Sequence, residues 1–182
     1  MDVFERLAAI EAERVLDVGA GLGGSIARLL AHLGRCGHVT DPAAVLAEMR
    51  RVLEPGGRLI VAEPHTGTTS EARRTDVLVH GWRARTDTML GVRHNQTFTR
   101  EALVALVAGL GLSDLEVLDY MPNDRDRTAP RSLEEIGQYQ ARLDGVVGAQ
   151  AARLREEGRS LEERVRRTGV EAAPALLILG RA

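Results

Sequence analysis

Residues 15–24 of the chain read VLDVGAGLGG, a short apolar run that ends in a cluster of glycines. An apolar run that stops at glycines is typical of a buried strand of a parallel sheet and the turn after it. Residues 25–33 then place apolar side chains at helical spacing and end before Gly34, a natural helix terminator. The stretch therefore predicts a strand, a glycine-rich turn and a helix.

The glycines of this turn indicate a ligand site. Glycines allow a tight turn and a close approach of a ligand to the backbone, while the amides of the helix N-terminus face that ligand. Gly19, Gly21 and Gly24 also fit the dinucleotide-binding fingerprint, which is weak evidence by itself. Asp17, just ahead of the first glycine, is the residue that discriminates between the possible ligands.

Composition excludes several classes of protein. The 182 residues include 24 basic and 26 acidic side chains, so the chain lacks the cationic excess of a nucleic-acid-binding protein. Every basic residue is arginine, which removes lysine-based chemistry. A single cysteine, Cys36, excludes an intrachain disulfide and suits a reducing compartment. No apolar run approaches membrane-spanning length. We therefore expect a cytoplasmic protein with no nucleic-acid or membrane partner.

The rest of the chain alternates between helical and strand patterns. Apolar spacing and helix-terminating residues predict helices over 41–53 and 99–110, strands over 58–62, 115–120 and 175–179, and a long polar loop over 65–97. Residues 132–135 read as a capping box that begins one helix over 132–157, and a second box at 160–163 begins another. The helix over 132–157 carries an apolar stripe formed by Leu133, Ile136, Leu143, Val147 and Leu154.

Residues 17–23 resemble the first motif of the class I S-adenosylmethionine-dependent methyltransferases, an acidic residue followed by three alternate glycines. Asp17, Gly19, Gly21 and Gly23 match it. Residues 48–64, EMRRVLEPGGRLIVAEP, look like the helix, turn and fifth strand of that family, and residues 97–120 are similar to its last helix and sixth strand. The resemblance implies that residues 17–23 bind S-adenosylmethionine, with Asp17 orienting the cofactor.

The resemblance also implies the fold. We expect an α/β protein with an incomplete Rossmann-like methyltransferase sheet, flanking helices and an added C-terminal helical segment. Residues 1–182 would form a single domain, with 123–173 a helical insertion before a seventh strand near residues 175–180. The sheet is expected to be incomplete because a βαβ unit takes about 30 residues. The interval from Gly23 to Arg51 leaves room for one short strand at most where the family has strands two to four.

An incomplete sheet would leave a strand edge with unpaired backbone groups. We therefore expect a homodimer, one form of which would exchange elements, with the stripe of the helix over 132–157 at the interface. The alternative is that this stripe packs on the chain's own sheet.

Two interpretations of Asp41 remain open. In one, Asp41 ends a short second strand and holds the ribose hydroxyls of the cofactor. In the other, Asp41 and Pro42 begin the helix over 41–53 as its cap. The close match of the helix and turn that follow favours the capping interpretation.

Catalytic candidates follow the strand over 58–62. Reactive crevices of open α/β sheets lie at the carboxyl ends of the strands, so Glu63 and His65 are the candidate base or acceptor-orienting residues. The alternative is a capping carboxylate and a loop histidine without a catalytic role.

Substrate-binding candidates lie in the predicted polar loop, since long loops often bind ligands. They are Trp82, Arg83 and His94. Arginines of the same segment would either hold an anionic acceptor or pair with nearby carboxylates; these are Arg73, Arg74, Arg83, Arg85 and Arg93. His80 and His94 are too isolated in sequence to predict a metal site, and the alternative is that the two histidines converge with Glu63.

The sequence thus predicts an S-adenosylmethionine-dependent methyltransferase that acts on a small-molecule acceptor. A noncatalytic methyltransferase-like subunit is the first alternative. A nicotinamide-binding oxidoreductase is the second, and Asp17 together with residues 48–57 argues against it.

Overall fold

The structure, a computed structural model, describes residues 41–122 and 127–182. The strand over 14–18, the helix over 25–33 and the glycine motif at 17–23 lie outside these residues and stay predictions. The described residues form two compact units. The first contains residues 41–64, 100–120 and 175–182, and the second contains residues 65–99 and 121–174.

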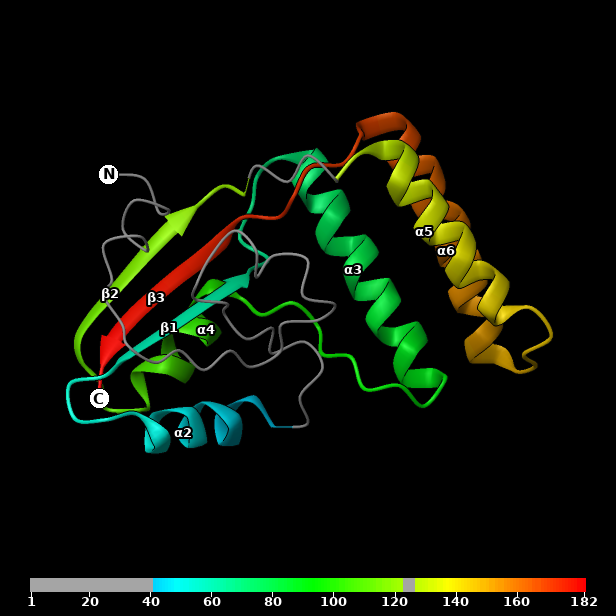
Figure 1. Cartoon of the computed structure of the whole chain (residues 1–182). Coiled ribbons are helices and arrows are strands. Elements are labelled where there is room, and N and C mark those ends of the chain that lie inside the picture. The colour runs from blue at the N-terminus through cyan, green and yellow to red at the C-terminus, as the bar shows by residue number, and fades with distance from the viewer. Residues whose placement is uncertain (1–40, 123–126) are drawn as a thin grey trace. The chain divides into compact units, whose positions relative to one another are not determined.

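The first unit is built on a three-stranded sheet (Figure 1). Its strands are β1 (Arg58–Pro64), β2 (Ser113–Tyr120) and β3 (Ala175–Arg181), in the order β1-β3-β2. β3 pairs antiparallel with both neighbours, which means that β1 and β2 run in the same direction. The chain is therefore of the mixed α/β class, as the sequence predicts.

β3 is buried along almost its whole length. Residues 175–180 are all buried, which explains why their sequence is apolar without alternation. Leu177 and Leu179 form the centre of a small core, packed by Ile60, Ala62 and Leu118. The predicted buried strand near the C-terminal end of the sequence is confirmed.

The helix and turn ahead of β1 follow their sequence signals. α2 (Pro42–Val52) begins at Asp41 and ends before the turn at residues 54–57. Gly56 has a φ of +78°, which favours glycine, and its N–H donates to the carbonyl of Ala182 at 3.0 Å. The N–H of Ala182 donates to the carbonyl of Gly57 at 2.9 Å, so this turn is joined to the end of β3.

α4 (Arg100–Ala108) leads into β2 and confirms the helix predicted over 99–110. It buries Leu103 and Val107. Arg100 at its start forms two hydrogen bonds to the Asp119 carboxylate of β2, at 2.9 and 2.7 Å. Two parallel bonds of this kind fix the relative orientation of the two side chains as well as pairing their charges.

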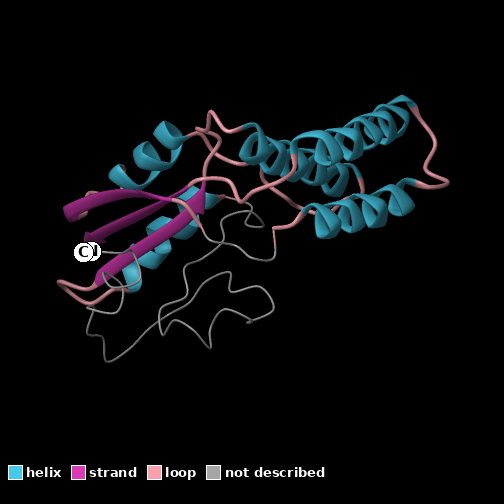
Figure 2. Cartoon of the chain, turned by 90° about the horizontal axis from the view of Figure 1, so that it is seen from above, coloured by secondary structure: helices cyan, strands magenta, loops and turns pink. Residues whose placement is uncertain are grey.

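The second unit is a group of three helices (Figure 2). They are α3 (Glu71–Met89), α5 (Ala129–Leu143) and α6 (Ala149–Thr168). Their shared core is formed by Val79, Trp82, Ile136, Leu143, Leu154, Leu161 and Val165. The described helices of the chain include none long and apolar enough to cross a membrane.

The prediction of a loop over 65–97 is wrong, because residues 71–89 form α3. The buried face of α3 contains Thr75, Asp76, Thr86 and Asp87 beside Val79, Trp82 and Ala84. Polar residues thus interrupt the apolar stripe of α3. Helix prediction from sequence depends on such a stripe. Partners on other segments satisfy the polar residues; for example, Asp76 Oδ2 accepts from the Ala173 N–H at 2.9 Å.

The predicted boundaries after residue 128 are also wrong. Thr128 is the N-cap of α5, accepting from the Arg131 N–H at 3.5 Å, whereas Ser132 lies buried within the helix. Gly145 and Gly148 have positive φ angles and separate α5 from α6, so residues 132–157 are not one helix. The box at 160–163 lies inside α6.

The predicted interface stripe is instead part of the helical core. Ile136 and Leu143 have no exposed surface and Leu154 is 4% exposed, all within the core shared by the three helices. Val147, which completes the predicted stripe, lies between the helices and is 91% exposed. Apart from Val147, the stripe packs on helices of its own unit. The homodimer itself stays a prediction.

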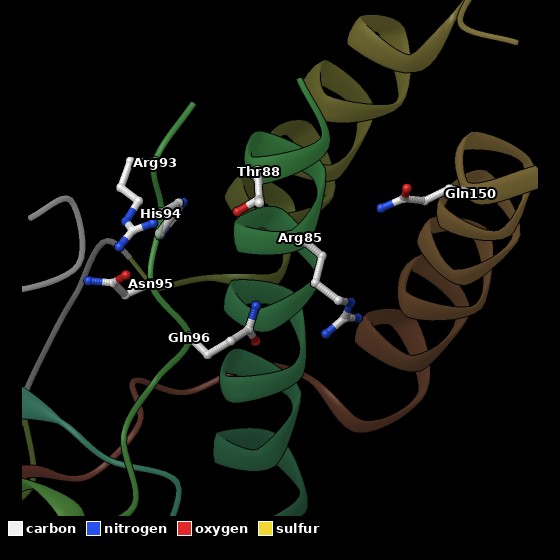
Figure 3. A pocket seen from close by; sticks show the side chains of 7 residues that line it. All are labelled: Arg85, Thr88, Arg93, His94, Asn95, Gln96 and Gln150. Carbon is white, nitrogen blue, oxygen red and sulfur yellow. The ribbon is translucent and has the colours of Figure 1, made fainter. Parts of the chain in front are cut away.

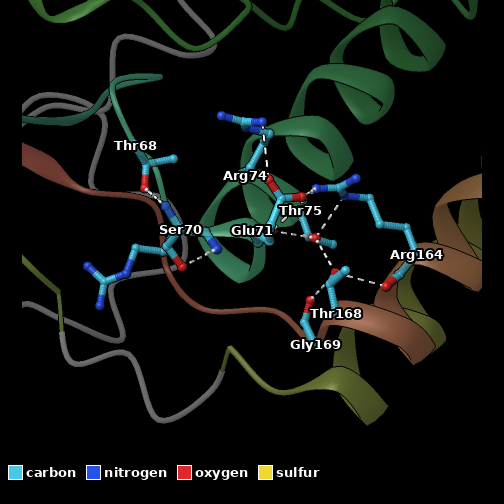
Figure 4. A network of polar contacts seen from close by, with 9 residues as sticks. Thr68, Ser70, Glu71, Arg74, Thr75, Arg164, Thr168 and Gly169 are labelled. Atoms are coloured by element: carbon cyan, nitrogen blue, oxygen red, sulfur yellow. Dashed lines mark hydrogen bonds and ion pairs between the residues drawn. The ribbon is translucent and has the colours of Figure 1, made fainter.

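A polar network joins the first turn of α3 to the last turn of α6 (Figure 4). The hydroxyls of Thr75 and Thr168 lie 2.9 Å apart, and Thr75 donates to the carbonyl of Glu71 at 2.9 Å. The Arg164 Nε donates to the Thr75 hydroxyl at 3.0 Å. These bonds fix the two helix ends where the apolar core stops.

Gly158 tests the close packing of α6 against its neighbours. A Cβ at this position would lie 2.8 Å from Trp82 Cζ2 and closer still to the Gln140 side chain. Gly158→Ala is therefore expected to lower the free energy of unfolding by about 1–3 kcal/mol through overpacking. Urea unfolding followed by circular dichroism measures it.

Gly137 of α5 is the matched control. A Cβ there meets nothing within 4 Å, and the residue is exposed. Gly137→Ala is expected to raise the free energy of unfolding by about 0.5–1 kcal/mol, because alanine loses less backbone entropy in a helix. Equal effects of the two substitutions would contradict the packing described for Gly158.

Candidate functional site

Glu63 and Tyr120 lie at the edge of the sheet where β1 and β2 end. Both strands run the same way, so their carboxyl ends meet at one edge. Glu63 is 7% exposed. Burial raises the pKa of the Tyr120 phenol, and the negative charge of Glu63 raises it further. Because ligands of open α/β sheets bind outside the carboxyl ends of strands, this edge is the candidate site of the first unit.

His65 follows β1 and belongs to the second unit. It is 2% exposed, and its Nδ1 accepts a hydrogen bond from the Gly67 N–H at 3.1 Å. A neutral imidazole has one donor and one acceptor nitrogen, so the hydrogen of His65 is on Nε2. In this tautomer Nε2 carries the hydrogen, whereas a general base would need that nitrogen unprotonated. The catalytic roles of Glu63 and His65 stay predictions.

Asp41 caps α2. Its Oδ1 accepts a hydrogen bond from the Ala44 N–H at 3.1 Å, and Pro42 occupies the first turn. A carboxylate oxygen in this position satisfies one of the amides that a helix start leaves without a partner. The capping interpretation of Asp41 is confirmed. The cofactor-binding candidates Asp17, Gly19, Gly21 and Gly23 lie outside the described residues.

Trp82 and Arg83, predicted to bind substrate, hold α3 against its neighbours. Trp82 has no exposed surface and donates from Nε1 to the carbonyl of Leu154 at 2.8 Å. The Arg83 guanidinium donates to Glu135 at 3.0 Å and lies over the Tyr139 ring. A fully buried indole has no surface to offer a substrate in this conformation. Both side chains therefore have packing roles here, and their substrate contacts stay predictions.

The arginines of the predicted loop pair with carboxylates. Four of the five form ion pairs within the second unit: Arg73 with Glu171, Arg74 with Glu71, Arg83 with Glu135 and Arg85 with Glu157. The exposed pairs among them, those of Arg74 and Arg85, contribute little to stability. Local pairing, the alternative to a site for an anionic acceptor, is what these contacts support.

Asp87 is the centre of a buried polar network in the second unit. Its Oδ2 lies 2.8 Å from His94 Nδ1 and accepts from the Tyr139 hydroxyl at 2.8 Å, while its Oδ1 pairs with Arg142 at 2.8 Å. Burial by itself would raise the pKa of Asp87. Hydrogen bonds from His94, Tyr139 and Arg142 outweigh that effect and hold the pKa below its usual value. Asp87 is therefore an anionic acceptor.

The network continues through two histidines. His94 Nε2 lies 3.1 Å from His80 Nε2, and His80 Nδ1 lies 2.9 Å from the Thr97 hydroxyl. From the sequence, a convergence of the two histidines with Glu63 is only the minor alternative, and His94 is selected as a substrate-binding candidate. The only available signal was that 14 residues separate the histidines, a spacing that brings them together only after a helix ends and the chain turns back.

His94 also lines an open hollow of the second unit (Figure 3). The hollow lies between the segment after α3, α3 itself and the start of α6. Its other lining residues are Arg85, Thr88, Arg93, Asn95, Gln96 and Gln150. All of these side chains are polar, so the hollow suits water and polar ligands.

Comparisons with known proteins give limited matches. The chain matches no protein-family model. Over 27 residues it is 70% identical to an uncharacterized 37.1 kDa protein of transposon TN4556 from Streptomyces fradiae, which covers 15% of this chain and 8% of that protein. A match of this length identifies no activity.

Solved structures that resemble this chain in part are described as methyltransferases. Phosphoethanolamine N-methyltransferase 2 of Haemonchus contortus, solved with S-adenosyl-L-methionine, is 13% identical over 98% of this chain and 51% of its own, with a TM-score of 0.48. A protein of Bacillus halodurans described as a methyltransferase is 15% identical over 80% of this chain and 59% of its own, with a TM-score of 0.39. The chain thus spans less than two thirds of these proteins, and likeness at this level does not determine what it binds.

Substitution of Asp41 tests the cap. Asp41→Ala removes the oxygen that accepts from Ala44 and is expected to lower the free energy of unfolding by about 1 kcal/mol. Asp41→Asn keeps an accepting oxygen and is expected to cost only a few tenths of that value. Thermal unfolding measures both. Equal losses in the two variants would show that charge, and not capping, is what Asp41 contributes.

Proposed function

We propose that the chain is an S-adenosylmethionine-dependent methyltransferase that acts on a small-molecule acceptor, with the cofactor held by residues 17–23. The observation that carries this proposal is the unit formed by residues 42–64. It folds into the helix, glycine turn and buried strand that the match at residues 48–64 implies, and it follows the glycine motif in the chain. Coincidence of two motifs in the correct order is improbable for an unrelated sequence.

The carboxyl edge of the sheet supplies groups that suit an acceptor. S-adenosylmethionine provides a methyl group on a sulfonium, and its transfer depends chiefly on alignment of the acceptor. Glu63 is proposed to orient the acceptor or take up its proton. Tyr120, whose raised pKa keeps the phenol protonated, is proposed to donate a hydrogen bond at the same edge. Asp41 already caps α2 through Oδ1, so the cofactor is proposed to depend on Asp17 and the glycines.

A cytoplasmic location and a homodimer belong to the same proposal. The lone Cys36 is compatible with an enzyme of a reducing compartment. Among the described strands, β3 is the only one that pairs with β1, so the other edge of β1 is where a further strand would pair.

Calorimetric titration with S-adenosylmethionine and S-adenosylhomocysteine tests the proposal. The wild-type chain is expected to bind both. Asp17→Ala and Gly21→Val are each expected to weaken binding at least tenfold, the first by removing the orienting carboxylate and the second by placing a branched side chain in the turn.

Two variants serve as controls. Glu163→Ala removes an exposed carboxylate of α6 and is expected to leave affinity unchanged. Asp41→Asn keeps the cap and is expected to do the same, whereas a loss there would revive the ribose-binding interpretation. A folded wild-type chain that binds neither compound would contradict the proposal and favour a noncatalytic methyltransferase-like subunit. Binding of NADH instead would favour the oxidoreductase.

A further inference from the structure

The imidazoles of His80 and His94 face each other through the same ring atom. Their Nε2 atoms lie 3.1 Å apart, the ring centroids are 4.8 Å apart, and the ring planes meet at 85°. Each ring is held from behind through Nδ1, His94 by the Asp87 carboxylate at 2.8 Å and His80 by the Thr97 hydroxyl at 2.9 Å. The two nitrogens that remain are therefore directed at a common region.

The partners of the rings determine where the hydrogens lie. Asp87 can only accept, so His94 carries its hydrogen on Nδ1 and presents the lone pair of Nε2. With no bound ion, His80 then donates from Nε2 to His94, and the Thr97 hydroxyl donates to His80 Nδ1. A hydroxyl both donates and accepts, so the hydrogen of His80 can move to Nδ1 and bond to Thr97 instead. After that change both Nε2 atoms present lone pairs.

We propose that His80 and His94 form a binding site for a divalent transition-metal ion of the kind that imidazole prefers, with Zn²⁺ as the probe. The Nε2 atoms are 3.1 Å apart. A zinc ion about 2.0–2.1 Å from each of them would make an Nε2–Zn–Nε2 angle of roughly 95–100°, which is compatible with zinc coordination. Carboxylate and hydroxyl groups behind ligating histidines are the usual means of fixing ring orientation at metal sites. This site replaces the expectation from sequence that the chain has none.

Water would complete the coordination of the ion. The described part of the chain brings together no group of three or more His, Cys, Asp and Glu side chains suited to a metal, so the described residues supply two ligands. His94 lines the open hollow, which is the side from which an ion and its waters would approach the pair. A site with two protein ligands keeps positions open for exchangeable ligands. It lies within the helical unit and does not depend on the proposed methyltransferase function.

Titration calorimetry of the full chain with Zn²⁺ tests this inference. The wild-type chain is expected to bind one equivalent, and His80→Ala and His94→Ala are each expected to weaken binding at least tenfold. Asp87→Asn keeps both ligands but weakens the hold on His94, with an expected loss of about 10–100-fold. Glu163→Ala, which removes an exposed carboxylate of α6, is the control and is expected to leave affinity unchanged. Absence of binding, or binding that is equal in all variants, would overturn the proposal.

A second measurement uses the wild-type chain alone and so does not depend on whether the variants fold. Nitrogen-15 NMR distinguishes the two tautomers of a neutral imidazole. Addition of Zn²⁺ is expected to move the hydrogen of one histidine from Nε2 to Nδ1 while a second histidine keeps its hydrogen on Nδ1. Spectra in which both rings keep their original tautomers at saturating Zn²⁺ would show that the pair is only a hydrogen bond.

Discussion

The structure of the first unit depends on the pairing of β3 between β1 and β2. β3 supplies the hydrogen-bond partners of one edge of each neighbour, and residues 175–180 are buried. These residues come from the end of the sequence, so β1 and β2 are joined only after the whole intervening chain has been made. The turn at Gly56 and Gly57 adds to this closure through its bonds to Ala182. The sheet is therefore held together by contacts between residues far apart in the sequence.

The same constraint explains the second unit. Residues 65–99 and 121–174 leave the sheet after β1 and β2 and return before α4 and β3, so the helical unit consists of two excursions from one sheet. Its helices need a core of their own, and Trp82 with the apolar residues of α5 and α6 provides it. Its polar residues form a separate system centred on Asp87, which joins α3, the segment after α3, and α5.

Local signals in the sequence predict the first unit well. Asp41 and Pro42 mark the start of α2, and the uninterrupted apolar run near residue 177 marks the buried strand. Local signals fail in the second unit because its helices are stabilised by contacts with segments distant in the sequence. α3 buries Asp76 and Asp87 beside Trp82, and those carboxylates are acceptable only because segments distant in sequence supply partners. The break between α5 and α6 depends on Gly145 and Gly148, whose positive φ angles a helical stripe does not reveal.

Candidate site residues follow the same division. Glu63 is found from sequence because it follows a recognisable strand, and Tyr120 joins it only once β1 and β2 are known to end at one edge. His80 and His94 come together through the end of α3, which the sequence pattern hides. The candidate site of the first unit can thus be recognised from sequence motifs, whereas the histidine pair of the second unit forms only through tertiary contacts.

Cross-linking of the cofactor to the chain tests the central claim most directly. The full chain would be irradiated with S-adenosylmethionine that carries a radioactive methyl group, digested with trypsin and mapped. Cleavage after Arg14 and Arg28 isolates residues 15–28, which contain the whole glycine motif. The account predicts label in that peptide that excess S-adenosylhomocysteine removes. Label distributed over other peptides, or unaffected by the competitor, would contradict it.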